Sequence, residues 1–315
     1  MAKYLVTGGA GFIGSNIAEA LLSRGDEVRV LDNLSTGYRH NVDDFDVEFV
    51  EGDITDASAV AKAVKGVDFV YHQAALASVP RSVKDPLASN EACVTGTVNV
   101  LHEAKKAGVK RVIYAASSSA YGDQPNMSKR EADLPAPLSP YAVAKLAGEY
   151  YCHAFWETYG LETVCIRYFN VFGPRQDPGS PYSAVIPLFI TALLENRQPT
   201  IYGDGEQTRD FTFIKNVVHG NLLAAEAPAA DVAGKTFNVA NGKSVSLNTM
   251  LKMLNELLGT DVQPKFEDAR VGDVRDSLAD ISNARKYLGY DSVVSFEDGL
   301  KQSIDFYKSL LVESK

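Results

Sequence analysis

The apolar positions of the first 170 residues alternate between short continuous runs and longer stretches with helical spacing. Short runs typical of buried strands occur at residues 3–6, 27–31, 47–50, 67–71, 111–116 and 163–168. Between them, the pattern predicts helices beginning near residue 17 and over residues 57–65, 87–106 and 141–158. This alternation is typical of a parallel sheet covered by helices on both faces. We therefore predict an α/β fold with a Rossmann-type, doubly wound parallel sheet.

The pattern changes beyond residue 170. Gly-Pro and Pro-Gly pairs between 173 and 181, and the turn at 203–205, predict two irregular crossings. Helices are predicted at 185–195, up to about 226, and at 247–258, 282–288 and 296–310, with strands at 211–214 and 235–240. We expect a large domain at 1–169, completed by about 211–240, and a smaller C-terminal α/β domain from 170–210 and 241–315.

Composition narrows the possible partners. The chain has 315 residues, 45% of them hydrophobic, and a net charge of −9, which argues against nucleic acid as a partner. Three scattered cysteines indicate reduced thiols, and the five histidines lack metal-binding spacing, so we expect no metal. No apolar run has the length of a membrane span, and the first predicted strand leaves no room for a signal peptide. We expect a cytoplasmic protein without a membrane partner.

A glycine-rich turn links the first predicted strand to the first predicted helix. Gly8, Gly11 and Gly14 allow a sharp turn, close approach of a pyrophosphate, and packing of the helix on the strand. The N–H groups at the helix N-terminus would face the phosphates. Asp32 ends the second strand, about twenty residues further on, where a carboxylate accepts hydrogen bonds from a ribose diol and repels a 2′-phosphate. The pattern predicts NAD rather than NADP; a turn-capping role for Asp32 is the alternative, because Asp32-Asn33 favours turns.

Ligands of open parallel sheets bind beyond the carboxyl ends of the strands. The residues directly after the third and fourth predicted strands suit a cofactor: Asp53 and Ile54 suit an adenine, and Gln73, Ala74 and Ala75 let it lie against the backbone. A plain turn residue is an equally good explanation of Asp53. The fifth strand ends at Ser117-Ser118-Ser119, and the sixth is followed by Asn170.

Tyr141 and Lys145 lie four residues apart in the predicted helix that Ser139-Pro140 opens. They therefore share a helix face, and the ammonium is expected to lower the pKa of the phenol from about 10 toward neutrality. Tyr-x-x-x-Lys alone is a weak signal that many helices contain by chance. It gains weight here from the serine-rich strand end and the glycine turn.

These motifs resemble the extended short-chain dehydrogenases that modify nucleotide sugars. The resemblance covers nearly the whole chain and also rests on His72-Gln-Ala-Ala75, Arg167-Tyr-Phe-Asn170, Thr208-Arg-Asp210 and Arg270. Among them the chain looks most like UDP-hexose 4-epimerases, particularly the branch acting on N-acetylated sugars. That branch shares the look of residues 77–82 and 115–119. The resemblance implies an NAD-dependent isomerase that oxidises sugar C4 and returns the hydride to the other face.

The resemblance also implies binding residues. NAD would be held by Gly8, Gly11, Phe12, Ile13, Gly14, Asp32, Asn33, Ser35, Thr36, Gly37, Asp53, Ile54, Gln73, Ala74, Ala75, Tyr141, Lys145 and Tyr168. The UDP-sugar would be held by Ser78, Arg81, Ser117, Ser118, Tyr141, Asn170, Val185, Tyr202, Arg209, Arg270, Asp273 and Ser277. The first domain would thus bind NAD and the second the nucleotide sugar.

The resemblance and the chemistry of the side chains together imply a specific role for several of these residues. Tyr141 would exchange the proton of the 4-hydroxyl, Lys145 would hold the nicotinamide ribose, and Ser117 would hydrogen-bond O4. Arg209 and Arg270 would bind the diphosphate. In relatives, the position matching Ser277 lies beside the sugar's 2-substituent, so this small residue leaves room for an N-acetyl group. The alternative is a polar residue in a surface loop.

Departures from the family leave alternatives open. Many relatives carry Asn at the position of Cys93, and the effect of this change is open. Ser118 stands where dehydratases and decarboxylases carry an acidic residue, which makes these reactions less favoured. A UDP-glucuronate 4-epimerase or decarboxylase, another NAD-dependent nucleotide-sugar oxidoreductase, or a non-enzymatic NAD sensor remain alternatives. Relatives pair the helices matching 87–106 and 141–158 into a homodimer, where Tyr151, Ala154 and Phe155 would serve, unless they pack within the chain.

Overall fold

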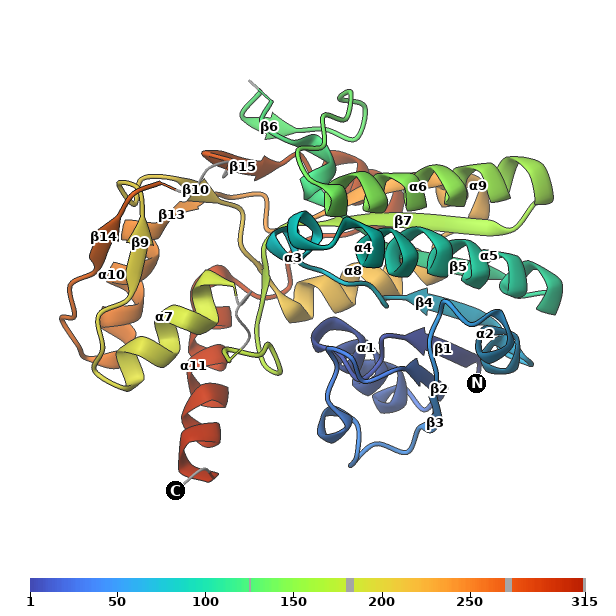
Figure 1. Ribbon diagram of the computed structural model, residues 1–315, viewed down its shortest axis with the longest axis horizontal. Helices are drawn as coiled ribbons and strands as arrows, with labels where there is room; N and C mark the ends of the chain where they lie inside the picture. Colours follow the sequence, from blue (N-terminus) through green and yellow to red (C-terminus); the bar gives the residue numbers. More distant parts are fainter. Residues whose placement is uncertain (125, 180–183, 270–273, 314–315) are drawn as a thin grey trace.

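A parallel sheet of seven strands forms the larger part of the molecule (Figure 1). The computed structural model describes residues 1–124, 126–179, 184–269 and 274–313. The strand order is β12–β7–β5–β4–β1–β2–β3, and every neighbouring pair is parallel. The strands are β1 (Lys3–Thr7), β2 (Glu27–Asp32), β3 (Glu48–Glu51), β4 (Phe69–His72), β5 (Arg111–Ser117), β7 (Glu162–Tyr168) and β12 (Lys235–Val239). The order in which the strands follow one another changes direction between β1 and β4, because β2 and β3 lie on one side of β1 and β4 lies on the other. Sheets of this kind bind ligands at that point.

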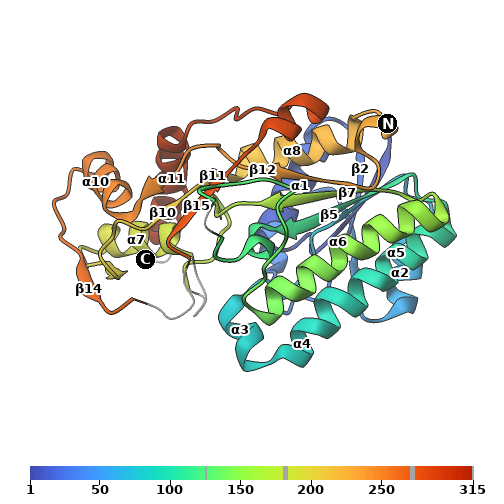
Figure 2. The ribbon, with the colours of Figure 1, turned by 90° about the horizontal axis from the view of Figure 1, so that it is seen from above.

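Helices cover both faces of this sheet (Figure 2). On one face lie α2 (Ala57–Val64), α5 (Gly96–Ala107) and α6 (Pro140–Tyr159), and on the other α1 (Phe12–Ser23) and α8 (Ile214–Glu226). The buried positions of α1 include Ile17, Ala18 and Leu21, the three-to-four-residue spacing that gives a helix one apolar face. A separate core on the α2–α5–α6 side contains Leu101, Cys152 and Phe155.

The helix predicted at 87–106 is divided in the structure. It consists of α4 (Pro86–Asn90), a π-helical turn η2 (Glu91–Thr95) and α5, and the unpredicted α3 (Val79–Lys84) precedes it. The Thr97 hydroxyl donates a hydrogen bond to the carbonyl of Cys93 (2.6 Å) at this turn. Single π turns inside helices are frequently found at functional sites.

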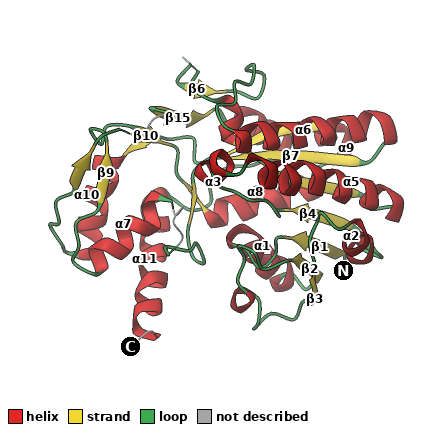
Figure 3. Ribbon diagram, viewed as in Figure 1, coloured by secondary structure: helices red, strands yellow, loops and turns green. Residues whose placement is uncertain are grey.

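Most of the remaining elements build the smaller part of the molecule (Figure 3). Strands β13 (Val245–Ser246), β10 (Thr208–Arg209), β15 (Asp276–Ala279) and β6 (Ser128–Lys129) form one sheet in this order. Two pairs are β8 (Val171–Phe172) with β11 (Thr212–Phe213) and β9 (Thr200–Tyr202) with β14 (Lys265–Glu267). The helices α7 (Val185–Leu194), α10 (Leu247–Leu258) and α11 (Phe296–Glu313) complete this part. The short helical segments η1 (Arg39–Asn41), η3 (Ser118–Tyr121), α9 (Ala229–Val232) and η4 (Ala284–Leu288) lie against the larger part.

The three residues of α6 that were predicted for a subunit interface differ in their exposure. Phe155 was expected at a subunit interface, and this is wrong for the chain as described, because its side chain is 8% exposed and belongs to the core beneath α6. Tyr151 and Ala154 are exposed on the same helix. No described helix combines the length and apolar character needed to cross a lipid bilayer.

Candidate active site

A cavity of about 520 Å³ opens at the carboxyl ends of the sheet strands. Its lining contains every residue predicted to hold the cofactor: Gly8, Gly11, Phe12, Ile13, Gly14, Asp32, Asn33, Ser35, Thr36, Gly37, Asp53, Ile54, Gln73, Ala74, Ala75, Tyr141, Lys145 and Tyr168. The strand ends of a parallel sheet meet at one edge, so residues up to 160 positions apart converge there.

The glycine turn leaves no room for side chains. Gly8 has a φ of +67°, and a Cβ there would lie 2.7 Å from the Ala74 nitrogen. A Cβ on Gly14 would lie 2.2 Å from the Gly8 carbonyl oxygen. Helix α1 starts after Gly11 without a side-chain cap, and its first residues line the cavity. An uncapped helix N-terminus suits a pyrophosphate, so these residues fit the NAD that the sequence predicts.

Two carboxylates line this cavity at the ends of β2 and β3. Asp32 is 7% exposed and accepts backbone hydrogen bonds from Ala10 (2.9 Å) and Leu34 (2.8 Å). Burial raises the pKa of Asp32, and these two N–H groups oppose the rise. The Leu34 bond is the turn-capping contact of the alternative explanation, so Asp32 both caps the turn and lines the cavity. Asp53 accepts from Asn33 (2.6 Å), which joins the two strand ends.

A buried hydrogen-bond chain runs beneath the cavity floor. Thr97 donates to a carbonyl, so it accepts from His72 Nε2–H (3.0 Å). Nδ1 of His72 then accepts from the Thr7 hydroxyl (2.7 Å), and Thr7 accepts from the Ala74 N–H (3.3 Å). Burial, and secondarily the charge of Lys145, lower the pKa of His72 to about 3. The imidazole is therefore neutral, and it ties the ends of β1 and β4 to the π turn.

Tyr141 and Lys145 enter the cavity from the first two turns of α6. Lys145 is 3% exposed, and its Nζ lies 4.7 Å from the centre of the Tyr114 ring. Burial raises the pKa of Tyr141 above its ordinary value, the Cys93 thiol adds to this, and a hydrogen bond with Ser117 acts in the opposite direction. The expected lowering of this pKa is wrong for the protein's own groups, because loss of solvent disfavours the phenolate more strongly.

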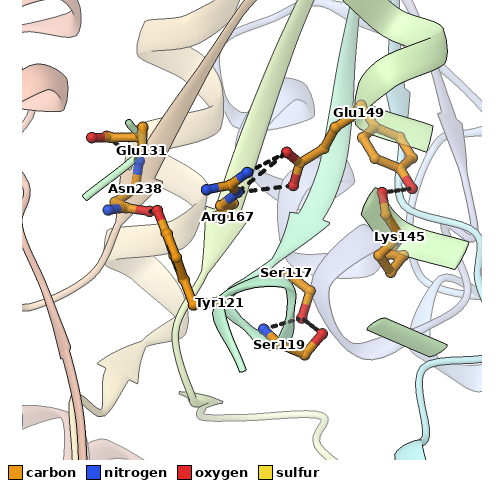
Figure 4. A network of polar contacts seen from close by, with 9 residues as sticks. Ser117, Ser119, Tyr121, Glu131, Lys145, Glu149, Arg167 and Asn238 are labelled. Carbon is orange, nitrogen blue, oxygen red and sulfur yellow. Dashed lines mark hydrogen bonds and ion pairs between the residues drawn. The ribbon is translucent and has the colours of Figure 1, made fainter. Parts of the chain in front are cut away.

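Ser117 caps the N-terminus of η3, beside Tyr141. Its Oγ accepts from the Ser119 N–H (3.2 Å) and lies 2.8 Å from Ser119 Oγ (Figure 4). Tyr141 lines the cavity, whereas Ser117 is not among the lining residues. Ser117 acts on Tyr141 by lowering its pKa.

A second cavity, of about 560 Å³, lies in the smaller part of the molecule. Four residues predicted to bind the nucleotide sugar line it: Asn170, Val185, Tyr202 and Arg209. Asn170 has a positive φ of 34°, and its side-chain amide donates to the carbonyl of Asp210 (3.2 Å). Four of the predicted substrate-binding residues therefore lie around one cavity.

The other predicted substrate residues lie elsewhere. Arg81 lines the first cavity rather than the second, and Ser78 caps α3 by accepting from the Arg81 N–H (3.2 Å). Ser118 lies in η3. Ser277 lies in β15 directly beside Arg209 and lines neither cavity. Arg270 and Asp273 fall outside the described residues.

The sequence reasoning missed several lining residues. Gln207 lines the second cavity; its amide donates to the Tyr202 carbonyl, and its Oε1 is buried without a hydrogen-bond partner among the described residues. Its position two residues before Arg209 was the available signal, because alternate strand residues share a face. In the first cavity, Ala88, Glu91 and Ala92 come from α4 and η2 and carry no motif. Among the described residues, no cluster of His, Cys, Asp or Glu is placed to hold a metal ion.

Comparison with known proteins identifies a matching family model. Residues 4–240 match the model described as the NAD dependent epimerase/dehydratase family. The UDP-glucose 4-epimerase of Mycolicibacterium smegmatis is 37% identical over 314 residues, which cover 98% of this chain and 99% of that protein.

Solved structures agree with this match. The UDP-N-acetylglucosamine 4-epimerase from Methanobrevibacter ruminantium M1, in complex with UDP-N-acetylmuramic acid, is 41% identical with a TM-score of 0.93, covering 98% of this chain and 99% of that one. The UDP-glucuronic acid 4-epimerase from Bacillus cereus, in complex with UDP-glucuronic acid and NAD, is 33% identical with a TM-score of 0.90 and the same coverage. The predicted Rossmann-type fold is confirmed.

Proposed function

Since the chain belongs to the NAD dependent epimerase/dehydratase family, we propose that it interconverts UDP-N-acetylglucosamine with UDP-N-acetylgalactosamine, and UDP-glucose with UDP-galactose. The coarser assignment stands without a proposal: the chain is an NAD-dependent isomerase of the UDP-sugar 4-epimerases, as its motifs predicted. The observation that most directly supports the proposal is that Tyr141 and Lys145 line the same cavity as the glycine turn.

Tyr141 and Ser117 handle the proton of the sugar 4-hydroxyl in this proposal. NAD, when bound, supplies the acceptor and donor of the hydride at sugar C4. Tyr141 takes the hydroxyl proton as general base and returns it as general acid, while Ser117 hydrogen-bonds the same oxygen. The arrangement of the elements supports this, because Tyr141 lines the first cavity from α6 and Ser117 caps η3, which packs against α6.

Lys145 holds the cofactor ribose and supplies positive charge beside Tyr141. Its Nζ rests against the Tyr114 ring, so it is oriented by a contact that needs no ligand. Burial lowers the pKa of Lys145, while the charge of Glu149 opposes this and favours the ammonium. The buried carboxylate of Glu149 thus favours the charged form of Lys145, which the proposed reaction requires.

The nucleotide sugar occupies the second cavity and reaches toward the first. Arg209, with Arg270, pairs with the diphosphate, and Asn170, Val185, Tyr202, Gln207 and Ser277 complete the site. On this proposal residues 1–169 with 211–240 bind NAD, and 170–210 with 241–315 bind the UDP-sugar. The protein works in the cytoplasm as a homodimer through the exposed faces of α5 and α6, where Tyr150 and Tyr151 are exposed.

The substrate proposal is tested with three separate incubations. The purified protein receives UDP-N-acetylglucosamine, UDP-glucose or UDP-glucuronate, and NMR follows the anomeric protons of the products. We expect 4-epimers from the first two sugars without accumulation of NADH. Turnover of UDP-glucuronate alone, or release of CO₂ from it, would replace the proposal with the glucuronate 4-epimerase or decarboxylase alternative; Ser118 argues against the decarboxylase.

A further inference from the structure

Three residues of one α6 face form a line from the active site into the protein. Tyr141, Lys145 and Glu149 are spaced by four residues, so their side chains share this face. Glu149 is 5% exposed. Its carboxylate binds the guanidinium of Arg167 on β7 through Nε–Oε1 (3.0 Å), Nε–Oε2 (3.2 Å) and Nη2–Oε2 (2.7 Å), as Figure 4 shows.

Arg167 also contacts the turn that carries the active-site serine. Its guanidinium carbon lies 4.6 Å from the centre of the Tyr121 ring. Tyr121 is the last residue of η3, the turn that Ser117 caps. Its hydroxyl donates to Asn238 Oδ1 (2.7 Å), and Asn238 is the neighbour of Arg167 in the sheet. Arg167 thus contacts both a side chain of α6 and a side chain of the serine turn.

Stability alone is a poor explanation of the Glu149–Arg167 pair. Both side chains are almost fully buried, and removing two charges from water costs roughly what their attraction returns. Apolar residues of similar volume often give equal or greater stability. A charged pair does, however, have a fixed bidentate geometry that apolar packing lacks.

We propose that Glu149, Arg167 and Tyr121, here called the brace, are positioning residues that fix the serine turn relative to the Tyr141–Lys145 face of α6. This inference rests on the catalytic roles proposed above. The brace residues line neither cavity, and they act by fixing the turn that Ser117 caps relative to the α6 face that carries Tyr141. A shift of about 1 Å between such groups can cost roughly 10²-fold in rate.

The brace also places a negative charge near Lys145. Four groups of the surrounding elements raise the pKa of the Lys145 ammonium: the thiols of Cys93, Cys152 and Cys165 and the carboxylate of Glu149. The Tyr114 ring contacts the ammonium, and the charge of Lys145 lowers the pKa of His72. Glu149 is the carboxylate of this set, and its charge raises the pKa of the Lys145 ammonium. Glu149→Gln should therefore move the alkaline limit of kcat to lower pH, because Lys145 loses its proton more easily.

The first experiment compares Glu149→Leu, Arg167→Leu and the double variant. Each single change leaves one buried charge unpaired and should lower the thermal midpoint strongly. The double variant should recover a midpoint above both single variants, while its kcat stays about tenfold or more below wild type and its KM changes less than about twofold. If kcat recovered together with stability, the pair would be purely structural and the proposal would be overturned.

The second experiment uses a matched pair of tyrosines, in case the ion-pair variants do not fold. Tyr121 and Tyr290 are each 1% exposed and each donates one hydrogen bond, the latter to the Ala240 carbonyl (2.8 Å). Tyr121→Phe and Tyr290→Phe should lower stability similarly, but only the first should lower kcat at unchanged KM. Equal kcat values for the two variants would overturn the proposal.

One further variant separates failure of the brace from failure of the proposed function. Tyr141→Phe should abolish turnover whatever the brace does. An inactive Tyr141→Phe with fully active brace variants refutes the brace alone. A fully active Tyr141→Phe refutes the catalytic roles on which the brace depends.

Discussion

Tyr141 shows how burial and neighbouring charge compete at a single side chain. Its pKa is raised by loss of solvent, although a cation lies one helical turn away. The protein's own groups therefore do not lower the pKa of Tyr141 enough for it to act as a general base at neutral pH. Binding of NAD⁺ adds the positive charge of its nicotinamide ring.

Replacement of Tyr141 by Phe tests this residue directly. The change keeps the ring and removes the proton acceptor, so turnover should fall by about 10²-fold or more while UDP-sugar affinity is largely kept. Steady-state kinetics measure the turnover, and calorimetric titration with UDP measures the affinity for the nucleotide part of the substrate. Wild-type turnover would exclude Tyr141 from the mechanism.

Ser277 is the residue proposed to admit an N-acetyl group. It lies beside Arg209, which lines the second cavity. Ser277→Tyr should suppress the N-acetylated reaction by steric exclusion and leave the UDP-glucose reaction largely intact. Product NMR with both sugars measures this, and a parallel loss of both activities would show that Ser277 is not the gate.

His72 connects stability to pH. Its pKa is about 3 in the folded protein and about 6.5 when exposed, so the folded state binds fewer protons between these values. The contribution of His72 to stability is complete above pH 6.5 and is lost as the pH falls toward 3. Between pH 7.5 and 5, wild type should lose about 2 kcal/mol more unfolding free energy than His72→Gln. Urea unfolding at both pH values measures it; identical losses would place His72 outside this linkage.

The strand–turn–helix unit at the N-terminus is the element that lines the first cavity with glycines. Its glycines serve different purposes: a Cβ on Gly14 would meet the Gly8 carbonyl at 2.2 Å, whereas a Cβ on Gly11 would meet the same atom at 3.2 Å. Gly14 is thus required by the fold of the turn, whereas Gly11 has more room and is the position at which we expect a ligand to approach the backbone.

Alanine variants of these two glycines should behave differently. Gly14→Ala should lower both the thermal midpoint and NAD affinity, the latter by at least about tenfold, because the turn must open. Gly11→Ala should lower NAD affinity with little change in the midpoint. Thermal unfolding with and without NAD distinguishes them, and equal midpoint losses would contradict the assignment.

At the scale of the whole molecule, the exposed side of α6 is the surface with an expected partner. Val143, Tyr150 and Tyr151 are 53%, 59% and 41% exposed along this helix. Exposed apolar side chains along one helix are typical of protein interfaces.

Charge on this surface should prevent association. We expect a dimer by light scattering at micromolar concentration and a monomer for Tyr151→Glu, because a buried carboxylate without a partner opposes association. Val293→Glu is the control, since Val293 is also exposed (60%) but precedes α11. A wild-type monomer would contradict the dimer.

The large sheet and the first cavity could be predicted because their signals are local. Each strand of the large sheet overlaps an apolar run, and the residues that follow these strands converge by the geometry of parallel sheets. In the small sheets, β11 overlaps the strand predicted at 211–214, but the other strands were not predicted, because most of them have two or three residues and are too short to show a period. The π turn at Cys93 was likewise hidden within one continuous helical pattern.

The fold class, the glycine turn and the chemical types that meet at the active site could be derived from the amino-acid sequence, because they depend on local periodicity and on residue identity. Properties that depend on solvent exclusion and on distant contacts required the folded molecule. It placed Phe155 in the core, raised the pKa of Tyr141 and joined Glu149 to Arg167. Burial is a property of the packed whole, so no short stretch of sequence specifies it.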